Sequence, residues 1–111
     1  MSIKPITTTV NDKGHLEIGG IDVVDLASTH GTPLYVIDES TLRHNCQQYK
    51  KNLSDIYENH LIVYAGKANL TIGLLNILHE EGFGVDVVSG GELFTALKSN
   101  MDPQNIVFHG N

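Results

Sequence analysis

The alternation of apolar runs and helical patterns after residue 60 restricts the possible folds more than any other feature. Three short apolar runs, at 61–65, 84–88 and 106–109, are separated by two segments with apolar residues at helical spacing. Continuous apolar runs are typical of parallel strands that are covered on both faces. The order strand, helix, strand, helix, strand therefore predicts an α/β protein with a parallel sheet.

Three strands cannot close a barrel or complete a wide doubly wound sheet. A closed eight-stranded barrel needs roughly 250 residues, whereas this chain has 111. We therefore expect the chain to be a piece of a larger protein.

Three helices are predicted from apolar periodicity. The first covers roughly 40–57, with Asp38 as its N-cap. The second covers about 70–81 and ends at Gly82. The third follows Gly90-Gly91. Their apolar faces consist of Leu42, Cys46, Tyr49, Leu53 and Ile56; of Leu70, Leu74, Leu75, Ile77 and Leu78; and of Leu93, Phe94 and Leu97.

The first 37 residues are predicted to be rich in strands and turns. Strands at 6–10 and 15–18 flank a turn with Asn11 and Gly14, which is a hairpin pattern. Residues 21–26 could be a strand or a short helical turn, and 34–37 are predicted to be a strand.

Composition excludes several classes of protein. The formal net charge of −6 argues against nonspecific nucleic-acid binding and against a basic membrane-binding surface. No signal peptide or membrane-spanning run is present, and the single cysteine cannot form an intrachain disulfide. The 6 histidines are scattered, so no metal site is predicted. We expect a cytoplasmic protein.

Lys67 is the first candidate for chemistry, because it is a charged residue placed soon after an apolar strand. By strand alternation Lys67 shares a face with Ala65, so if this small residue faces a crowded interior, Lys67 does too. Burial disfavours the charged ammonium, and a neutral amine can attack a carbonyl to form a Schiff base. The residues alone leave a second interpretation open, in which Lys67 is a solvated loop lysine.

Three further candidates lie near the ends of the predicted strands. Asp86 sits among apolar strand residues, where a carboxylate needs a partner such as Lys67, although a frayed strand end would also explain it. Glu92 could be a charge partner or simply an acidic residue in the first turn of a helix. His109 could line a pocket or be a hydrogen-bonded packing residue.

The segment Tyr64-Ala65-Gly66-Lys67-Ala68-Asn69, followed by Leu74, Leu75, Leu78 and Gly82, resembles the pyridoxal-phosphate attachment signature of the ornithine/diaminopimelate/arginine decarboxylase family. Residues 31–38, 84–93 and 106–111 are similar to the segment that leads into the family's barrel and to the second and third strands. Phe108-His109-Gly110-Asn111 resembles the diaminopimelate branch in particular.

This resemblance implies a pyridoxal-phosphate-binding (β/α)8 TIM barrel of the alanine racemase type, with a β-rich second domain, in a homodimer. Residues 1–37 would belong to the β-rich domain, and 38–111 would form the first, incomplete portion of the barrel. Lys67 would be the Schiff-base lysine. Ala65, Asp86 and His109 would lie beside the cofactor, with Glu92 as a possible charge partner.

The implied reaction is the decarboxylation of meso-2,6-diaminoheptanedioate to L-lysine and carbon dioxide, a step in lysine biosynthesis that uses the cofactor as an electron sink. A decarboxylase of ornithine, arginine or carboxynorspermidine remains open, as does a non-catalytic truncated relative. Other parts of the active site would lie beyond Asn111, so we expect the 111-residue chain alone to be inactive.

Overall fold

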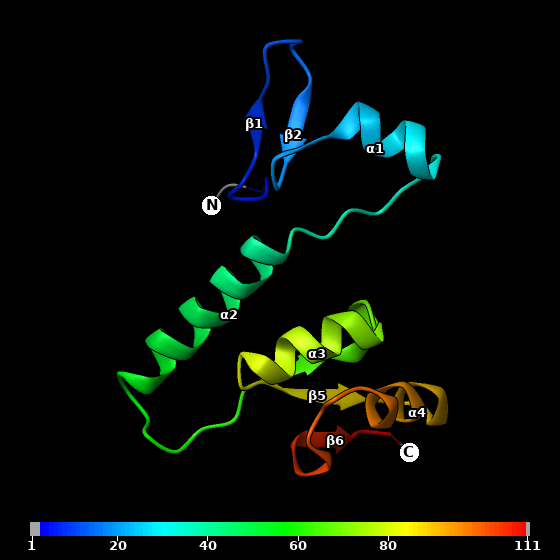
Figure 1. Cartoon of the computed structure of the whole chain (residues 1–111). Helices are drawn as coiled ribbons and strands as arrows, with labels where there is room; N and C mark the ends of the chain where they lie inside the picture. The colour runs from blue at the N-terminus through cyan, green and yellow to red at the C-terminus, as the bar shows by residue number, and fades with distance from the viewer. Residues whose placement is uncertain (1–2, 111) are drawn as a thin grey trace. The chain divides into compact units, whose positions relative to one another are not determined.

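The computed structural model describes residues 3–110 and contains two compact units, residues 1–45 and 46–111 (Figure 1). The division falls inside the long helix α2 (Glu39–Ser54). Each unit is described by itself. The domain boundary between residues 37 and 38 stays a prediction, because a compact unit need not coincide with a domain of the whole protein.

The N-terminal unit contains a small antiparallel sheet and one short helix (Figure 1). The sheet has the order β1 (Thr9–Val10), β2 (Leu16–Ile18), β3 (Ile21–Asp22). The hairpin prediction is confirmed, although its first strand is shorter than the expected 6–10. The segment 21–26, which could be strand or helix, is divided between β3 and helix α1 (Val23–His30).

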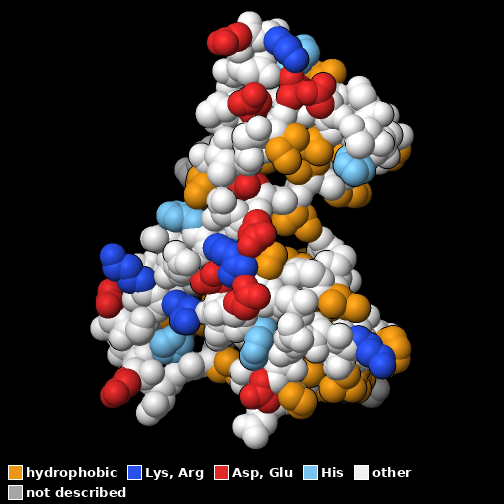
Figure 2. Space-filling model, viewed as in Figure 1, with side chains coloured by type: hydrophobic (Ala, Val, Ile, Leu, Met, Phe, Trp, Pro, Cys, Tyr) orange, Lys and Arg blue, Asp and Glu red, His pale blue; other side chains and the backbone are white. Residues whose placement is uncertain are grey.

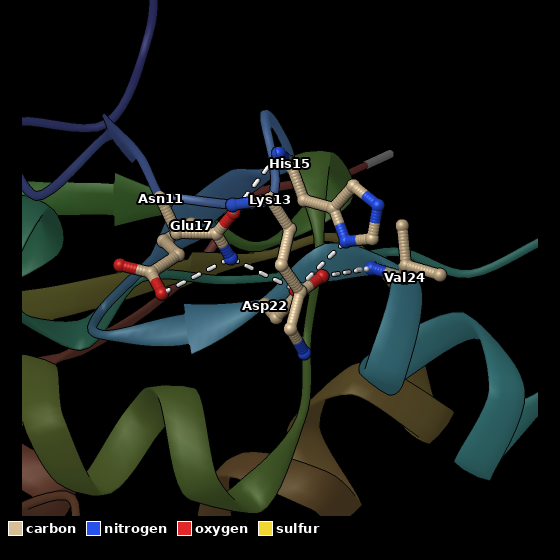
Figure 3. Close-up of polar contacts among 6 residues, drawn as sticks. All are labelled: Asn11, Lys13, His15, Glu17, Asp22 and Val24. Atoms are coloured by element: carbon tan, nitrogen blue, oxygen red, sulfur yellow. Dashed lines mark hydrogen bonds and ion pairs between the residues drawn. The ribbon is translucent and has the colours of Figure 1, made fainter.

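Asp22 is the centre of a polar network in this unit (Figure 3). Its carboxylate accepts hydrogen bonds from Asn11 Nδ2 and Val24 N–H and lies 2.9 Å from His15 Nδ1. Burial opposes ionisation of Asp22, but the hydrogen bonds from His15, Asn11 and Val24 outweigh it and lower the pKa to about 2. Because Asp22 is also the N-cap of α1, the network joins the hairpin to the helix.

The predicted strand at 34–37 is wrong. These residues are exposed and pair with no strand in the described part of the chain. Apolar, β-branched composition favours a strand only where a neighbouring strand completes its hydrogen bonds. The expected N-cap that follows is confirmed, because Asp38 accepts hydrogen bonds from the N–H and hydroxyl of Thr41. These bonds lower the pKa of Asp38.

The C-terminal unit is built on a parallel sheet, as predicted, with the order β4 (Val63–Ala65), β5 (Gly84–Val87), β6 (Ile106–Phe108). Helix α3 (Ile72–Glu80) connects β4 to β5, and helix α4 (Gly90–Lys98) connects β5 to β6. Two short 3₁₀ turns are also present: η1 (Gly66–Ala68) directly after β4, and η2 (Pro103–Asn105) directly before β6. The predicted α/β class and the strand–helix alternation are confirmed.

One side of β5 forms the core of this unit. Val85 and Val87 are fully buried, and so are Leu75 and Ala96 on the two connecting helices. The predicted stop of α3 is confirmed: Gly82 has φ 76°, and Phe83 N–H donates to the carbonyl of Leu78 across the helix end. Helices α3 and α4 both pack on this apolar face of the sheet, as expected for helices that connect parallel strands.

Two predicted helix faces are partly wrong. Phe94 and Leu97 are exposed on α4, where Ala96 is the buried residue. Tyr49 is exposed on α2, and Ile56 is exposed beyond the end of α2 at Ser54, so the helix predicted over 40–57 is shorter than expected. Figure 2 shows hydrophobic side chains at the molecular surface. Helical spacing shows which residues share a face but not whether another element covers that face. Cys46 is buried, as predicted.

Among the described residues, no helix combines the length and the hydrophobicity that a transmembrane helix requires. Within the same residues, no group of three or more His, Cys, Asp and Glu side chains is arranged to hold a metal ion.

Candidate functional site

Strand register gathers candidate residues on one face of the parallel sheet. Ala65 is opposite Asp86, and Asp86 is opposite Val107. Because side chains alternate along β5, Asp86 points away from the buried face formed by Val85 and Val87. The opposite face of the sheet, where it nears the carboxyl ends of its strands, therefore carries a small side chain beside a carboxylate.

Lys67 lies in η1, immediately after the end of β4. The chain leaves β4 after Ala65 and turns at Gly66, which is buried. A Cβ atom on Gly66 would lie only 2.8 Å from the backbone oxygen of Asp86 and 3.1 Å from the Leu70 side chain. Only glycine allows this approach, which places the turn carrying Lys67 directly against β5.

The strand position expected for Lys67 is wrong. Strand alternation does not continue to Lys67, since Gly66–Ala68 form a 3₁₀ turn rather than strand. Lys67 is exposed in this chain, as in the second interpretation, a solvated loop lysine. Ala65 is exposed as well, so the condition that it faces a crowded interior is not met among the described residues.

Asp86 has one paired and one unpaired carboxylate oxygen. Oδ2 lies 3.8 Å from Nδ1 of His109, which follows β6. Oδ1 is enclosed by protein and has no hydrogen-bond partner among residues 3–110. The side chain is 28% exposed. An enclosed carboxylate oxygen without a partner is unfavourable by itself, so Asp86 has an open place for a cationic donor.

Glu92 has a structural contact of its own. Its carboxylate accepts the N–H of Val88, while its own N–H donates to the hydroxyl of Ser89, the N-cap of α4. This reciprocal arrangement resembles a capping box. In the described part of the chain, no ion pair joins Glu92 to Lys67. The role of charge partner stays a prediction for Glu92.

Two functional features were missed by reasoning from the sequence. Gly66 receives no role there, although a glycine between a strand and a helical pattern is a signal of close backbone approach. Tyr64 is the second: its hydroxyl donates to the carbonyl of Asn69 at 3.0 Å and closes the turn around Lys67. Burial raises the pKa of this tyrosine. No sequence pattern marks that bond.

The side chains at this edge fit an aldehyde cofactor with a cationic centre. Lys67 is an exposed primary amine that makes no ion pair within residues 3–110, and amines of this kind bind carbonyl groups covalently. Asp86 offers an unpaired acceptor for positive charge, and Ala65 leaves space beside it. Active sites of (β/α)8 barrels lie at this carboxyl edge of the strands.

Comparison with known proteins identifies the family. Residues 39–111 match the family described as pyridoxal-dependent decarboxylase, pyridoxal binding domain. The chain belongs to this family. This match confirms the family resemblance of the residues around Lys67, and it confirms the expectation of a pyridoxal cofactor.

Curated relatives of this pyridoxal-dependent decarboxylase chain include diaminopimelate decarboxylases. Diaminopimelate decarboxylase from Methanothermobacter thermautotrophicus is 50% identical over 92% of the chain and 24% of its own length. The enzyme of the same name from Bacillus methanolicus is 46% identical over 95% of the chain and 24% of its own length. The chain therefore spans about a quarter of the length of the curated relatives it matches.

Solved structures that resemble this chain include diaminopimelate decarboxylases. The crystal structure of diaminopimelate decarboxylase from M. jannaschii has a TM-score of 0.81 and 40% identity, covering 94% of this chain and 25% of that one. The Helicobacter pylori enzyme, solved in complex with L-lysine, has a TM-score of 0.68 and 33% identity, covering 80% of this chain and 22% of that one. This likeness supports the predicted fold, the opening portion of a pyridoxal-phosphate-binding barrel.

Proposed function

We propose that this chain is the N-terminal part of a pyridoxal-phosphate-dependent decarboxylase that converts meso-2,6-diaminoheptanedioate to L-lysine and carbon dioxide. The main support is the 50% identity to a diaminopimelate decarboxylase over 92% of the chain. The candidate site adds chemical support, because an amine and an unpaired carboxylate lie at the sheet edge that barrel enzymes use.

Each residue of the candidate site has a proposed role. Lys67 holds the cofactor covalently through Nζ and is the catalytic residue. Asp86 neutralises positive charge at that linkage, and Ala65 leaves room for the cofactor beside it. His109 lines the same space. When bound, pyridoxal phosphate supplies an electron sink for the electron pair that is left when carbon dioxide departs.

The proposal extends to the whole protein. Residues 1–37 would belong to a β-rich domain, and residues 38–111 would be the first portion of the barrel, with the remainder of the site supplied by the rest of the longer protein. The complete enzyme would be a cytoplasmic homodimer that acts on a small diamino dicarboxylic acid. A chain covering 24% of its relatives lacks most of that site, so we expect it to be inactive alone.

Covalent trapping tests the role of Lys67. The full-length protein is incubated with pyridoxal phosphate and reduced with borohydride, and the modified peptide is identified by mass spectrometry. The label should be on Lys67 and should be lost in Lys67→Arg. Lys98→Arg is the matched control and should keep the label. Lys98 is on α4, away from the candidate site, and its amine lies over the Phe94 ring. A label on another lysine would refute the assignment.

Substrate competition tests the reaction. Release of carbon dioxide from diaminopimelate should exceed release from ornithine or arginine by at least about 100-fold in kcat/KM, because a site that pairs a second charged group rejects substrates that lack it. Faster release from ornithine or arginine would favour a decarboxylase of another basic amino acid. No release from any of them, with Lys67 still labelled, would favour a non-catalytic relative.

A further inference from the structure

We infer that His109 is a positioning residue that acts on the cofactor through Asp86. In this arrangement His109 holds one oxygen of the Asp86 carboxylate, and the other oxygen is left for the nitrogen of Lys67. The inference rests on the proposed function, because it assumes that Lys67 holds the cofactor.

The backbone places His109 beside Asp86 on the sheet. His109 N–H donates to the carbonyl of Val87 at 2.8 Å, which extends the ladder between β5 and β6 by one residue beyond Phe108. In this register Val107 is opposite Asp86, so alternation brings the side chain of His109 to the same face. The position of His109 is therefore set by strand pairing, not by a mobile loop.

The side-chain contact is electrostatic. The 3.8 Å between His109 Nδ1 and Asp86 Oδ2 is within ion-pair range but too long for a hydrogen bond. The attraction is therefore strongest when the imidazole carries a proton. His109 is 76% exposed and can approach the carboxylate freely, whereas Asp86 is 28% exposed and lies on a central strand. His109 is thus the member of the pair that can adjust.

The two oxygens of Asp86 have different surroundings. Oδ2 faces His109, while Oδ1 is enclosed and has no hydrogen-bond partner within residues 3–110. The imidazole near Oδ2 favours the orientation of the carboxylate in which Oδ2 faces His109, and so it biases the direction of the unpaired oxygen. A fixed acceptor stabilises a neighbouring cation better than a rotating one, because no ordering is needed on binding. A Cβ on Gly66 would meet the backbone oxygen of Asp86, so the turn that carries Lys67 packs against the residue that bears this carboxylate.

This inference differs from direct contact between His109 and the cofactor, and a double-mutant cycle separates the two. If His109 acts through Asp86, its replacement has no further effect once the carboxylate is gone. If His109 touches the cofactor itself, the two replacements have independent, multiplicative effects on the dissociation constant.

The experiment measures the apparent dissociation constant of full-length protein for pyridoxal phosphate, from borohydride labelling of Lys67 against cofactor concentration. Asp86→Asn should weaken binding about tenfold and His109→Phe about threefold, as expected for loss of a charge-assisted contact and of its support. The double variant should bind no more weakly than Asp86→Asn. His109→Asn, which keeps an N–H donor but cannot carry a positive charge, should weaken binding about as much as His109→Phe.

His44→Phe is the matched control for a histidine-to-phenylalanine change at an exposed position, and it should leave cofactor binding unchanged. If His109→Phe does not fold, His109→Ala takes its place in the cycle. Multiplicative effects in the double variant, or unchanged binding in His109→Phe, would overturn the inference while leaving Lys67 labelled. Absence of any label on Lys67 in the unmodified protein would instead overturn the proposed function, and this inference with it.

Discussion

At the scale of single residues, Gly66 decides how closely the turn of Lys67 approaches β5. We expect Gly66→Ala to destabilise the full-length protein by about 1–3 kcal/mol, because the new methyl group would meet the Asp86 backbone oxygen at 2.8 Å. It should also weaken borohydride labelling of Lys67. Urea denaturation and the labelling assay measure the two effects.

Gly73→Ala is the matched control for Gly66→Ala. No atom lies within 4 Å of the position of its Cβ, and Gly73 is within α3. Alanine in a helix is favoured over glycine by roughly 0.5–1 kcal/mol, so this variant should be slightly stabilised. Equal stability of the two variants would show that the contact with β5 is not tight.

Asp22 makes the N-terminal unit sensitive to acid. Its pKa is lowered from 3.8 to about 2, so the hydrogen bonds of the ionised form stabilise the fold fully above pH 3.8. That contribution should be lost as the pH falls towards 2. The Asp22 carboxyl carbon should titrate near pH 2 by NMR, and thermal stability between pH 5 and 2 should fall less steeply in Asp22→Asn.

Asp12→Asn provides the comparison for Asp22→Asn. Asp12 is exposed and follows Asn11 in the sequence, but the hydrogen bonds to the Asp22 carboxylate come from Asn11, His15 and Val24. Its replacement should leave the acid sensitivity almost unchanged. An Asp22 titration near pH 4 would contradict the strength assigned to the hydrogen bonds from His15, Asn11 and Val24.

Residues whose environment is set locally could be predicted from the sequence. The N-cap role of Asp38 and the stop at Gly82 depend on neighbours within a few residues, and the structure confirms both. The position of Lys67 depends instead on where β4 stops. An apolar run does not show where a strand ends, so alternation predicts a strand position for Lys67, whereas β4 ends at Ala65.

At the scale of elements, the start of α4 holds Glu92 in place. Ser89→Ala should destabilise the full-length protein by about 1 kcal/mol, because the first turn loses its N-cap hydrogen bond. Glu92→Gln keeps an acceptor for Val88 N–H, so its stability in urea should change by less than about 0.5 kcal/mol, within the range of ordinary surface substitutions.

The same Glu92→Gln variant tests the second role predicted for this residue. If Glu92 only caps α4, labelling of Lys67 by pyridoxal phosphate should be unchanged in Glu92→Gln. If Glu92 also balances charge at the cofactor, labelling should weaken while stability does not change. The two readouts together separate a capping residue from a charge partner.

The sequence predicts an element well where its own residues determine its structure, and poorly where its structure depends on contact with another element. Helices α3 and α4 were expected from spacing and caps and are present. The segment 34–37 has strand composition but lies unpaired. Likewise, Phe94 and Leu97 have helical spacing, yet no described element covers them. Strand pairing and side-chain burial depend on other elements of the fold, which the local sequence does not identify.

At the scale of the whole molecule, the parallel sheet could be predicted because helical crossovers require parallel neighbours. Its order β4-β5-β6 leaves β4 and β6 each paired on one side only within residues 3–110. The face that carries Asp86 also exposes apolar side chains of the outer strands, among them Val63 and Val107. Unpaired strand edges and exposed apolar side chains are both typical of a surface that other parts of a protein cover.

We therefore expect the isolated 111-residue chain to be partly unfolded or to aggregate. Unpaired strand edges and exposed apolar side chains favour association between copies. Light scattering after size-exclusion chromatography should show species larger than the monomer, and a urea transition should be broad. Val107→Lys, which places a charge on the edge strand β6, should reduce association without touching the buried face. A sharp, reversible two-state transition of the unmodified monomer would show that these edges need no further cover.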